Sequence, residues 1–495
     1  MSITILFVQC KDIIFINIWN KQTERICNNG NKILIEINVC KFFNTYKCFE
    51  IWMFRLFVLL LCIGVNKIYI MRVLIVNTSE KTGGAAVAAN RLLDALNNNG
   101  VKAKMLVRDK ETSDITVIGL GNNLRRQLAF LWERWCIYTH LHFRRTNLFQ
   151  IDIANAGNDI TKLREFKEAD VVHLHWINQG MLSLKGIRKI LESGKPVVWT
   201  MHDFWPATSL CHYPRNCHAY MTRGCHNCQY LPQGGSANDL SVKTWKRKET
   251  IWKAHNIIFV ACSRWLALAV KSSALLSGKE VVNIPNTIDT RLFKPIDINE
   301  ARKRLSLPLD KKIILFVSQK ITDSRKGIDY LISACEMMVK EHPQIKDTHE
   351  IVILGGHSEE YSSRFQLKVH SLGYVNESQK IVDVYNAADV FVLPSLEDNL
   401  PNTIMEAMAC GTPCVGFNVG GIPEMIEHRK NGYVALSRSA EDLAKGIFWV
   451  TEEAKYDELI INAVHKVAVS YSQQSVAMKY IEIYNQAIAY RHYRL

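Results

Sequence analysis

The sequence predicts an α/β protein built from two doubly wound parallel sheets, each in its own domain. The chain has 495 residues, which is too long for one ordinary hydrophobic core. From Met71 onward, short apolar runs such as RVLIVN alternate with stretches of helical periodicity, which is typical of parallel strands covered by helices on both faces. The alternation restarts at KIILFVSQ, after a connection near residues 284–297, so we expect two such units.

Each predicted strand is a short apolar run followed by a loop. The runs are RVLIVN, AKMLVR, ADVVHLHW, PVVWTMHD, NIIFVACS and VVNIPN in the first unit, and KIILFVSQ, EIVILGG, DVFVLPS and PCVGFN in the second. We expect an N-terminal domain over residues 71–288, a C-terminal domain over 289–470, and a helix in 471–495 that packs back on the N-terminal domain. Open parallel sheets bind ligands at the carboxyl ends of their strands, so two facing sheets predict a cleft.

Residues 1–70 differ from the rest of the chain. They are rich in Ile, Asn, Lys, Phe and Cys, and their apolar run FVLLLCIGV is shorter than the roughly 20 residues of a spanning helix. A signal peptide would begin at residue 1. Because Met71 directly precedes the first strand, we expect it to be the natural start and residues 1–70 to be an extension that is not native or is disordered. A membrane-tethering extension is the alternative.

The composition is that of a globular protein, with 48% hydrophobic and 22% charged residues. The formal charge of +14 favours anionic partners, which could be nucleic acid, phosphorylated metabolites or an acidic membrane surface. Nothing after residue 70 signals export, so we expect a cytoplasmic protein whose cysteines are free thiols or metal ligands.

In each unit, one motif follows the first strand. Gly83 and Gly84 lie where a turn enters a helix, so backbone N–H groups can approach an anion; a simple tight turn is the alternative. Arg325 and Lys326 stand just before Gly327 and another helix, where adjacent cations suit a diphosphate. A solvated charged loop is the alternative there.

In the stretch VFVLPSLEDNLPNTIMEAMACG, two carboxylates have seven residues between them. Asp398 lies in the loop after a buried strand, and Glu406 lies one turn into the following helix. This spacing lets one carboxylate face a sugar while the other accepts hydrogen bonds from vicinal hydroxyls. The alternative is a capping box formed by Thr403 and Glu406.

The stretch CHYPRNCHAYMTRGCHNC, residues 211–228, holds four cysteines. Four thiolates in one loop can close a tetrahedral structural zinc site, although only the final CxxC has a spacing typical of zinc. Two disulfides and unlinked thiols are the alternatives. The candidate ligands are Cys211, Cys217, Cys225 and Cys228, with His212, His218 and His226 in reserve.

Two further stretches have an open role. Residues 123–145 have helical spacing, aromatic on one side and basic on the other, so this helix could lie in a membrane interface or pack on its own domain. His173 and His175 alternate at a strand end, and we expect them to face opposite sides in a structural role.

Segments 283–295 and 385–433 closely resemble the retaining glycosyltransferases of family 4, which have the GT-B fold. Segments such as WTMHDFWPATSLCHY resemble the bacterial polysaccharide-synthesis branch of that family. The resemblance covers residues 71–490 and is most specific in the C-terminal half. It implies a retaining hexosyltransferase of cell-surface polysaccharide synthesis, which moves a sugar from a nucleotide-sugar donor to a glycan or lipid-linked acceptor. It further implies no metal for catalysis, no nucleic-acid partner, and peripheral contact with the anionic cytoplasmic face of a membrane.

The resemblance also assigns roles to residues. Arg325 and Lys326 would hold the diphosphate, and Glu406 would grip the ribose hydroxyls. Asp398 stands where the family has its first glutamate, so either its shorter side chain reaches the donor sugar or Glu397 takes that role. The family also has an arginine earlier in the loop, where this chain reads SQK, and Gln319, Lys320 or Arg325 could replace it.

The residues expected in catalysis are Arg325, Lys326, Asp398, Glu406 and His202, and those expected in donor binding are Gly83, Gly84, Glu397, Asn399 and Leu400. Two rival hypotheses are a zinc-stapled nucleic-acid-binding protein and an inactive GT-B protein. The cysteine cluster lacks the regular paired spacing of zinc-finger modules, which weighs against the first.

Overall fold

The computed structural model describes residues 2–9, 12–19, 70–121, 123–222 and 224–492. The chain divides into two compact units, residues 1–70 and residues 71–495. In the first unit, β1 (Ser2–Gln9) and β2 (Asp12–Trp19) pair antiparallel. The rest of the predicted extension, with its apolar run Phe57–Val65, lies outside the described residues.

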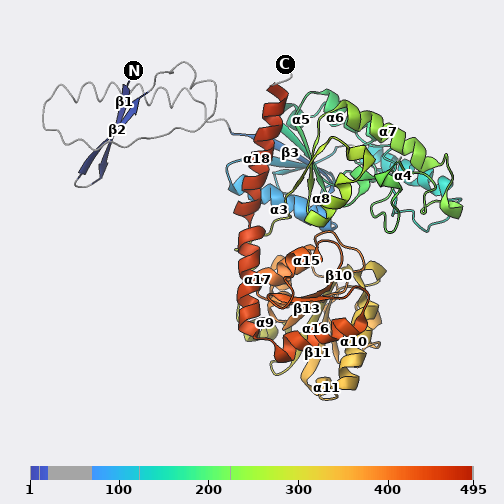
Figure 1. Ribbon diagram of the computed structural model, residues 1–495, viewed down its shortest axis with the longest axis vertical. Helices are drawn as coiled ribbons and strands as arrows, with labels where there is room; N and C mark the ends of the chain where they lie inside the picture. The colour runs from blue at the N-terminus through green and yellow to red at the C-terminus, as the bar shows by residue number, and fades with distance from the viewer. Residues whose placement is uncertain (1, 10–11, 20–69, 122, 223, 493–495) are drawn as a thin grey trace. The chain divides into compact units, whose positions relative to one another are not determined.

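The second unit begins with a seven-stranded parallel sheet in the order β5-β4-β3-β6-β7-β8-β9 (Figure 1). Its strands are β3 (Arg72–Ser79), β4 (Lys102–Asp109), β5 (Val117–Gly119), β6 (Val171–Leu174), β7 (Val197–Met201), β8 (Ile258–Ala261) and β9 (Glu280–Asn283). Its helices are α3 (Gly84–Asn98), α4 (Asn123–His140), α5 (Arg164–Glu168), α6 (Leu184–Glu192), α7 (Leu240–Ala254) and α8 (Arg264–Lys271).

A second parallel sheet of six strands follows, in the order β12-β11-β10-β13-β14-β15. Its strands are β10 (Lys312–Lys320), β11 (His349–Gly356), β12 (Val369–Ser371), β13 (Val390–Leu393), β14 (Cys414–Phe417) and β15 (Gly432–Ala435). Its helices are α9 (Ile298–Leu305), α10 (Ile328–Glu341), α11 (Ile345–Thr348), α12 (Glu359–Ser362), α13 (Ser378–Asn386), α14 (Asn402–Ala409), α15 (Ile422–Met425), α16 (Ala440–Phe448) and α17 (Tyr456–Ser470). Two doubly wound parallel sheets confirm the predicted fold class.

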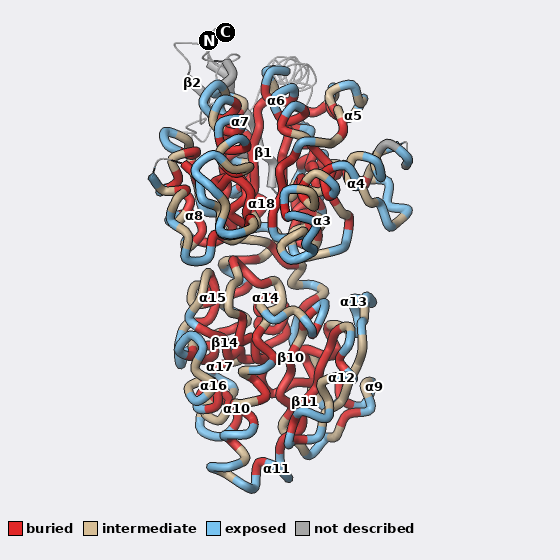
Figure 2. Tube along the Cα trace, turned by 90° about the vertical axis from the view of Figure 1, so that its right-hand side faces the viewer, coloured by how far each residue is buried: buried red, intermediate tan, exposed pale blue. Residues whose placement is uncertain are grey.

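Both faces of each sheet are covered, because consecutive strand residues point to opposite sides. Val73 and Ile75 of β3 pack with α3 and with the last helix, α18 (Gln473–His492). Leu74 and Val76 pack on the other face with α5 to α8. The buried strands of Figure 2 therefore lie between two helical layers in each domain.

The chain crosses between the two sheets twice, and the crossings are paired. The Ile288 N–H and the Thr287 hydroxyl each donate to the Tyr471 carbonyl at 3.0 Å. After this point α18 packs on α3 and on the N-terminal sheet (Figure 1). Inside that contact, the Tyr484 hydroxyl lies 2.7 Å from Nδ1 of His173. Helix α18 thus ties the C-terminal end of the chain to the first sheet.

His173 and His175 lie on the same side of their strand, so the expectation that they face opposite sides was wrong. Their ring centroids are 4.3 Å apart, and His175 Nδ1 lies 2.9 Å from His202 Nε2. Side chains alternate along a strand with a period of two, so residues two apart share a face. The three imidazoles therefore form one row, which is buried at His173 and His175 and ends at the half-buried His202.

Helix α4 turns two adjacent charged residues inward. Glu133 and Arg134 are buried, whereas Leu128 and Trp132 are more than half exposed. Among the described residues, no helix has both the length and the apolar character that crossing a bilayer requires.

The row of histidines predicts acid sensitivity. Burial lowers the pKa of His173 to about 3 and of His202 to about 4, and it lowers the pKa of His175 as well. Below the ordinary pKa of about 6.5, the unfolded chain takes up protons that the folded chain refuses, so stability falls as the pH falls. Two groups oppose this trend, because burial raises the pKa of Glu133 to about 7 and carboxylates raise that of His212 to about 10. The three histidines of the row outweigh them, so we expect the urea midpoint to drop between about pH 7 and about pH 5.

Replacing one member of the row should make this dependence shallower. His173→Asn should lower the urea midpoint at neutral pH, because the hydroxyls of Tyr484 and Thr200 lose their partner. The difference between the midpoints at about pH 7 and about pH 5 should nevertheless become smaller, because one buried imidazole is gone. Burial also lowers the pKa of His349, in the other domain, to about 4. His349 therefore adds its own part to the pH dependence of stability, and this part should remain in His173→Asn. An unchanged pH slope in His173→Asn would contradict the assignment.

Candidate functional site

A cavity of about 810 Å³ lies where the carboxyl ends of the two sheets face each other. The N-terminal domain contributes the loop after β3, together with Arg108, Trp176, His202 and Tyr213. The C-terminal domain contributes the end of β10, the turn before α10 and the loop after β13. Both sheets are parallel and open, so this is the place where the fold itself predicts a ligand.

The glycine turn after β3 opens directly into the cavity. Gly83 has φ of 94°, a conformation that favours glycine, and it caps the start of α3. Asn402, at the first turn of α14, donates to the Gly84 carbonyl at 3.0 Å. Helices α3 and α14 therefore begin side by side, and the first residues of both helices line the cavity.

Arg325 and Lys326 both line the cavity, in a short 3₁₀ turn (Ser324–Lys326) before α10. Lys326 Nζ lies 2.6 Å from the Asp398 carboxylate, and Arg325 donates to Asp323 at 2.8 Å. The Arg325 guanidinium also lies over the Tyr213 ring, 5.4 Å from its centroid. Each of the two cations is therefore paired with a neighbouring carboxylate.

The loop after β13 brings three of its predicted residues to the cavity. Asp398, Asn399 and Leu400 line it, and Asn399 bridges the domains, accepting from the Ser263 hydroxyl at 2.5 Å and donating to the His202 carbonyl at 3.2 Å. Glu397 is not a lining residue. It lies 3.8 Å from Arg215, and burial raises its pKa.

Glu406 is buried and is absent from the cavity lining. It accepts hydrogen bonds from Arg91 of α3 at 2.6 Å and from the Tyr385 hydroxyl at 2.7 Å. The capping-box alternative is wrong, because α14 begins at Asn402 and is capped by Pro401, which places Glu406 beyond the first turn. Arg91 and Tyr385 carry no local signal in the sequence, since only the packing of α3 and α13 on α14 brings them to Glu406.

His202 lines the cavity as a neutral imidazole, because burial lowers its pKa to about 4. Its Nε2 faces His175, and its Nδ1 lies 3.7 Å from the Cys262 thiol. Both ring nitrogens of His202 therefore already have a partner inside the protein.

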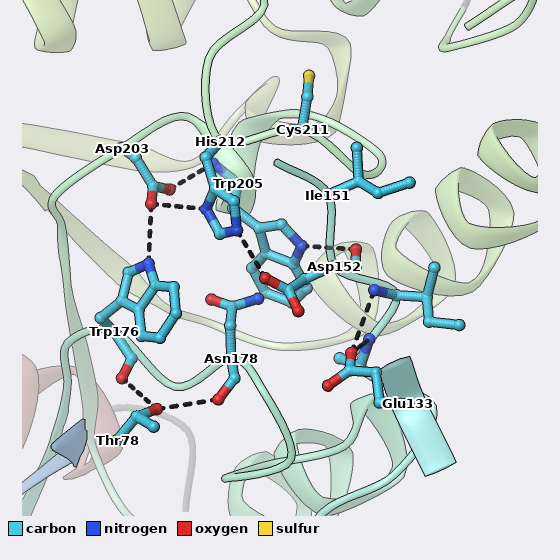
Figure 3. A network of polar contacts seen from close by, with 12 residues as sticks. Thr78, Glu133, Ile151, Asp152, Trp176, Asn178, Asp203, Trp205, Cys211 and His212 are labelled. Carbon is cyan, nitrogen blue, oxygen red and sulfur yellow. Dashed lines mark hydrogen bonds and ion pairs between the residues drawn. The ribbon is translucent and has the colours of Figure 1, made fainter. Parts of the chain in front are cut away.

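Behind the cavity, Figure 3 shows a buried ionic network around His212. His212 contacts Asp152 at 2.6 Å and Asp203 at 2.7 Å, and these carboxylates raise its pKa to about 10 although burial alone would lower it. Asp203 also accepts from the indole of Trp176 at 2.9 Å. The network thus fixes Asp203 and Trp176, two residues that line the cavity.

The four cysteines of the cysteine-rich loop, residues 211–228, surround one small cavity of about 20 Å³. Every cysteine in the described part of the chain is a free thiol. Burial raises the pKa of Cys225 to about 12 and that of Cys228 to about 11. In the same described residues, no three His, Cys, Asp or Glu side chains are arranged to hold a metal ion.

Several cavity residues were not predicted. Tyr213 lies inside the cysteine-rich loop, where only the cysteines and histidines were predicted to have a role. Asn402 and Arg108 occupy ordinary positions at a helix start and a strand end. Their role follows from which strand ends the topology brings together, which no local pattern encodes.

Comparison with known proteins supports the resemblance of this sequence to glycosyltransferases. A family model described as Glycosyltransferase Family 4 matches residues 82–292, and one described as Glycosyl transferases group 1 matches residues 311–453. An uncharacterized glycosyltransferase of Methanocaldococcus jannaschii is 26% identical over 367 residues, covering 69% of this chain and 91% of that protein.

Two further proteins are similar over large parts of the chain. An N,N'-diacetylbacillosaminyl-diphospho-undecaprenol alpha-1,3-N-acetylgalactosaminyltransferase of Campylobacter jejuni is 27% identical, covering 52% of this chain and 68% of that protein. The crystal structure of HepE from Anabaena in complex with UDP-glucose has a TM-score of 0.55 at 16% identity, covering 84% of this chain and 100% of that one. The chain therefore contains a Glycosyltransferase Family 4 domain and a Glycosyl transferases group 1 domain, and it is a glycosyltransferase with the GT-B fold.

Proposed function

We propose that this glycosyltransferase takes a hexose from a nucleotide-sugar donor and passes it, with retention of configuration, to a glycan or lipid-linked acceptor in cell-surface polysaccharide synthesis. The observation that carries the proposal is the cavity between the domains, with two cations and two helix starts on its walls. HepE was crystallised with UDP-glucose, and the name of the Campylobacter relative specifies a diphospho-undecaprenol acceptor. Retention rests on the family resemblance.

In this proposal the diphosphate binds at the turn that holds Arg325 and Lys326. Each charge-assisted hydrogen bond to a phosphate oxygen contributes about 1.5–3 kcal/mol. As the bond between the anomeric carbon and the phosphate oxygen breaks, negative charge grows on the diphosphate. The two cations and the N–H groups at the starts of α3 and α14 stabilise that charge.

The donor sugar then lies against the loop after β13. Asp398 lines the cavity, whereas Glu397 is turned toward Arg215, so Asp398 is the residue better placed for the sugar hydroxyls. The neutral side chain of His202 stands on the opposite wall. Glu406 holds the start of α14 against α3 through Arg91, which makes it a positioning residue in this geometry.

Replacing Lys326 tests the diphosphate site. Lys326→Ala should lower kcat/KM for nucleotide release from the donor about 10- to 100-fold, since one charge-assisted contact is lost. Lys346→Ala, an exposed lysine on α11, is the matched control and should leave the rate unchanged. A screen of nucleotide sugars by nucleotide release identifies the donor first. Full activity in Lys326→Ala would sink the assignment, and no turnover with any donor would favour the inactive alternative.

A double-mutant cycle tests the role of Glu406. If Glu406 acts through Arg91, then Glu406→Ala and Arg91→Ala should weaken binding of the donor nucleotide by similar factors, and the double variant should be no worse than either. Isothermal titration with UDP measures all four proteins. Loss of affinity in Glu406→Ala alone would instead show that this carboxylate grips the ribose directly.

The cysteine-rich loop supports a second, separable proposal, that it holds one structural zinc ion. Four thiols around one cavity supply the right donors, although they would have to draw together to coordinate the metal. Metal analysis of protein purified under reducing, chelator-free conditions should find one zinc per chain. Cys228→Ser should lose it, and Cys335→Ser, a buried thiol of the C-terminal domain, should keep it. Zinc-free wild-type protein would end this proposal.

A further inference from the structure

Among the described residues of the cysteine-rich loop, Tyr213 alone lines the cavity between the domains. It belongs to the N-terminal domain, yet its ring lies against the guanidinium of Arg325 in the C-terminal domain, 5.4 Å from the ring centroid. The face of an aromatic ring attracts a cation at this distance. The cysteine-rich loop therefore supplies the wall of the cavity that Arg325 faces.

The backbone of Tyr213 is anchored on both sides. The residue before it, His212, is held between the buried carboxylates of Asp152 and Asp203 (Figure 3). The Tyr213 carbonyl itself accepts a hydrogen bond from the Tyr230 hydroxyl at 2.5 Å. Moving Tyr213 away from the cavity would pull His212 out of a buried ionic contact, which is costly because the carboxylates would be left unpaired. The tyrosine is therefore in position before any ligand binds.

A second contact ties the cysteine-rich loop to the C-terminal domain. Arg215 lies 3.8 Å from Glu397, in the loop after β13. Its guanidinium also lies over the Tyr230 ring, 5.4 Å from the centroid, so the same tyrosine holds both Arg215 and the Tyr213 carbonyl. The loop thus contacts the turn that contains Arg325 and the loop after β13, which are the two segments expected to bind the donor.

The hydroxyl of Tyr213 has unused hydrogen-bonding capacity. It bonds to no other residue that the structure describes, whereas the hydroxyls of Tyr230, Tyr385 and Tyr484 each contact a polar group of the protein. Its oxygen is also not sealed off from solvent. A phenol titrates near pH 10, so at neutral pH this hydroxyl is protonated and can donate. A free donor beside the Arg325 cation suits an anionic ligand.

We propose that Tyr213 is a ligand of the donor: its hydroxyl donates a hydrogen bond to the second phosphate of the bound nucleoside diphosphate, while its ring holds Arg325. The inference rests on the proposed function, in which the diphosphate binds at the turn of Arg325 and Lys326. Lys326 is paired with Asp398, in the loop against which the sugar would lie. This turn therefore faces the end of the diphosphate that carries the sugar, which is its second phosphate.

Isothermal titration of the full chain with UDP and with GDP tests the contact, using whichever nucleotide the wild type binds. Tyr213→Phe keeps the ring and removes the hydroxyl. It should bind the diphosphate about tenfold or more weakly, because a hydrogen bond to a charged group is lost. It should bind the corresponding monophosphate, UMP or GMP, as the wild type does, because the second phosphate is absent. Tyr213→Leu should weaken diphosphate binding further, since Arg325 also loses the ring.

Tyr374→Phe, at an exposed tyrosine of the C-terminal domain, is the matched control and should leave both affinities unchanged. Thermal unfolding checks that each variant is folded. Equal diphosphate affinity in the wild type and Tyr213→Phe would overturn the contact. An equal loss for diphosphate and monophosphate would also overturn it, because the hydroxyl would then have a structural role. Wild-type protein that binds neither UDP nor GDP would contradict the proposed function itself, and the assignment of Tyr213 with it, so the two failures are distinct results.

Discussion

The parallel direction of the strands is the constraint on which the rest of this structure depends. In a parallel sheet all strands end at one edge, so every loop that follows a strand gathers there. The two sheets turn these edges toward each other across a cavity of about 810 Å³. The paired crossings at Ile288 and Tyr471, and the return of α18 to the first sheet, keep the edges facing. Residues as distant as Gly84 and Asn402 become neighbours for this reason alone.

Buried charge organises the second level of the molecule. Asp152, Asp203 and His212 form a charged network behind the cavity, and each ionised group has a partner of opposite sign. The same network takes up Arg134 from α4. A buried charged group needs a partner of opposite charge, so α4 must keep the side that carries Arg134 turned inward. The outward position of the apolar residues of α4 and the ordered cavity wall therefore have one cause.

Much of the site could be predicted from local sequence because its residues directly follow strands. Gly83, Arg325, Lys326 and Asp398 were expected at the cleft, and the structure brings them to one cavity. Prediction failed where a pattern had two local explanations. The capping box of Thr403 and Glu406 requires the helix to begin two residues later than it does. Glu397 and Asp398 are adjacent acids, and only the position of Arg215 turns one of them away from the cavity.

The sequence by itself determined the alternation of strands and helices, the position of the glycine and cation turns, and the family. These are encoded in periodicity and in residue types at fixed spacing, which any segment carries within itself. The tertiary structure decided which residues meet across the domains, namely Arg91 with Glu406, Asn399 with Ser263, and Tyr213 with Arg325. It also decided which side of α4 faces water. Such outcomes depend on partners hundreds of positions away, so no local pattern contains them.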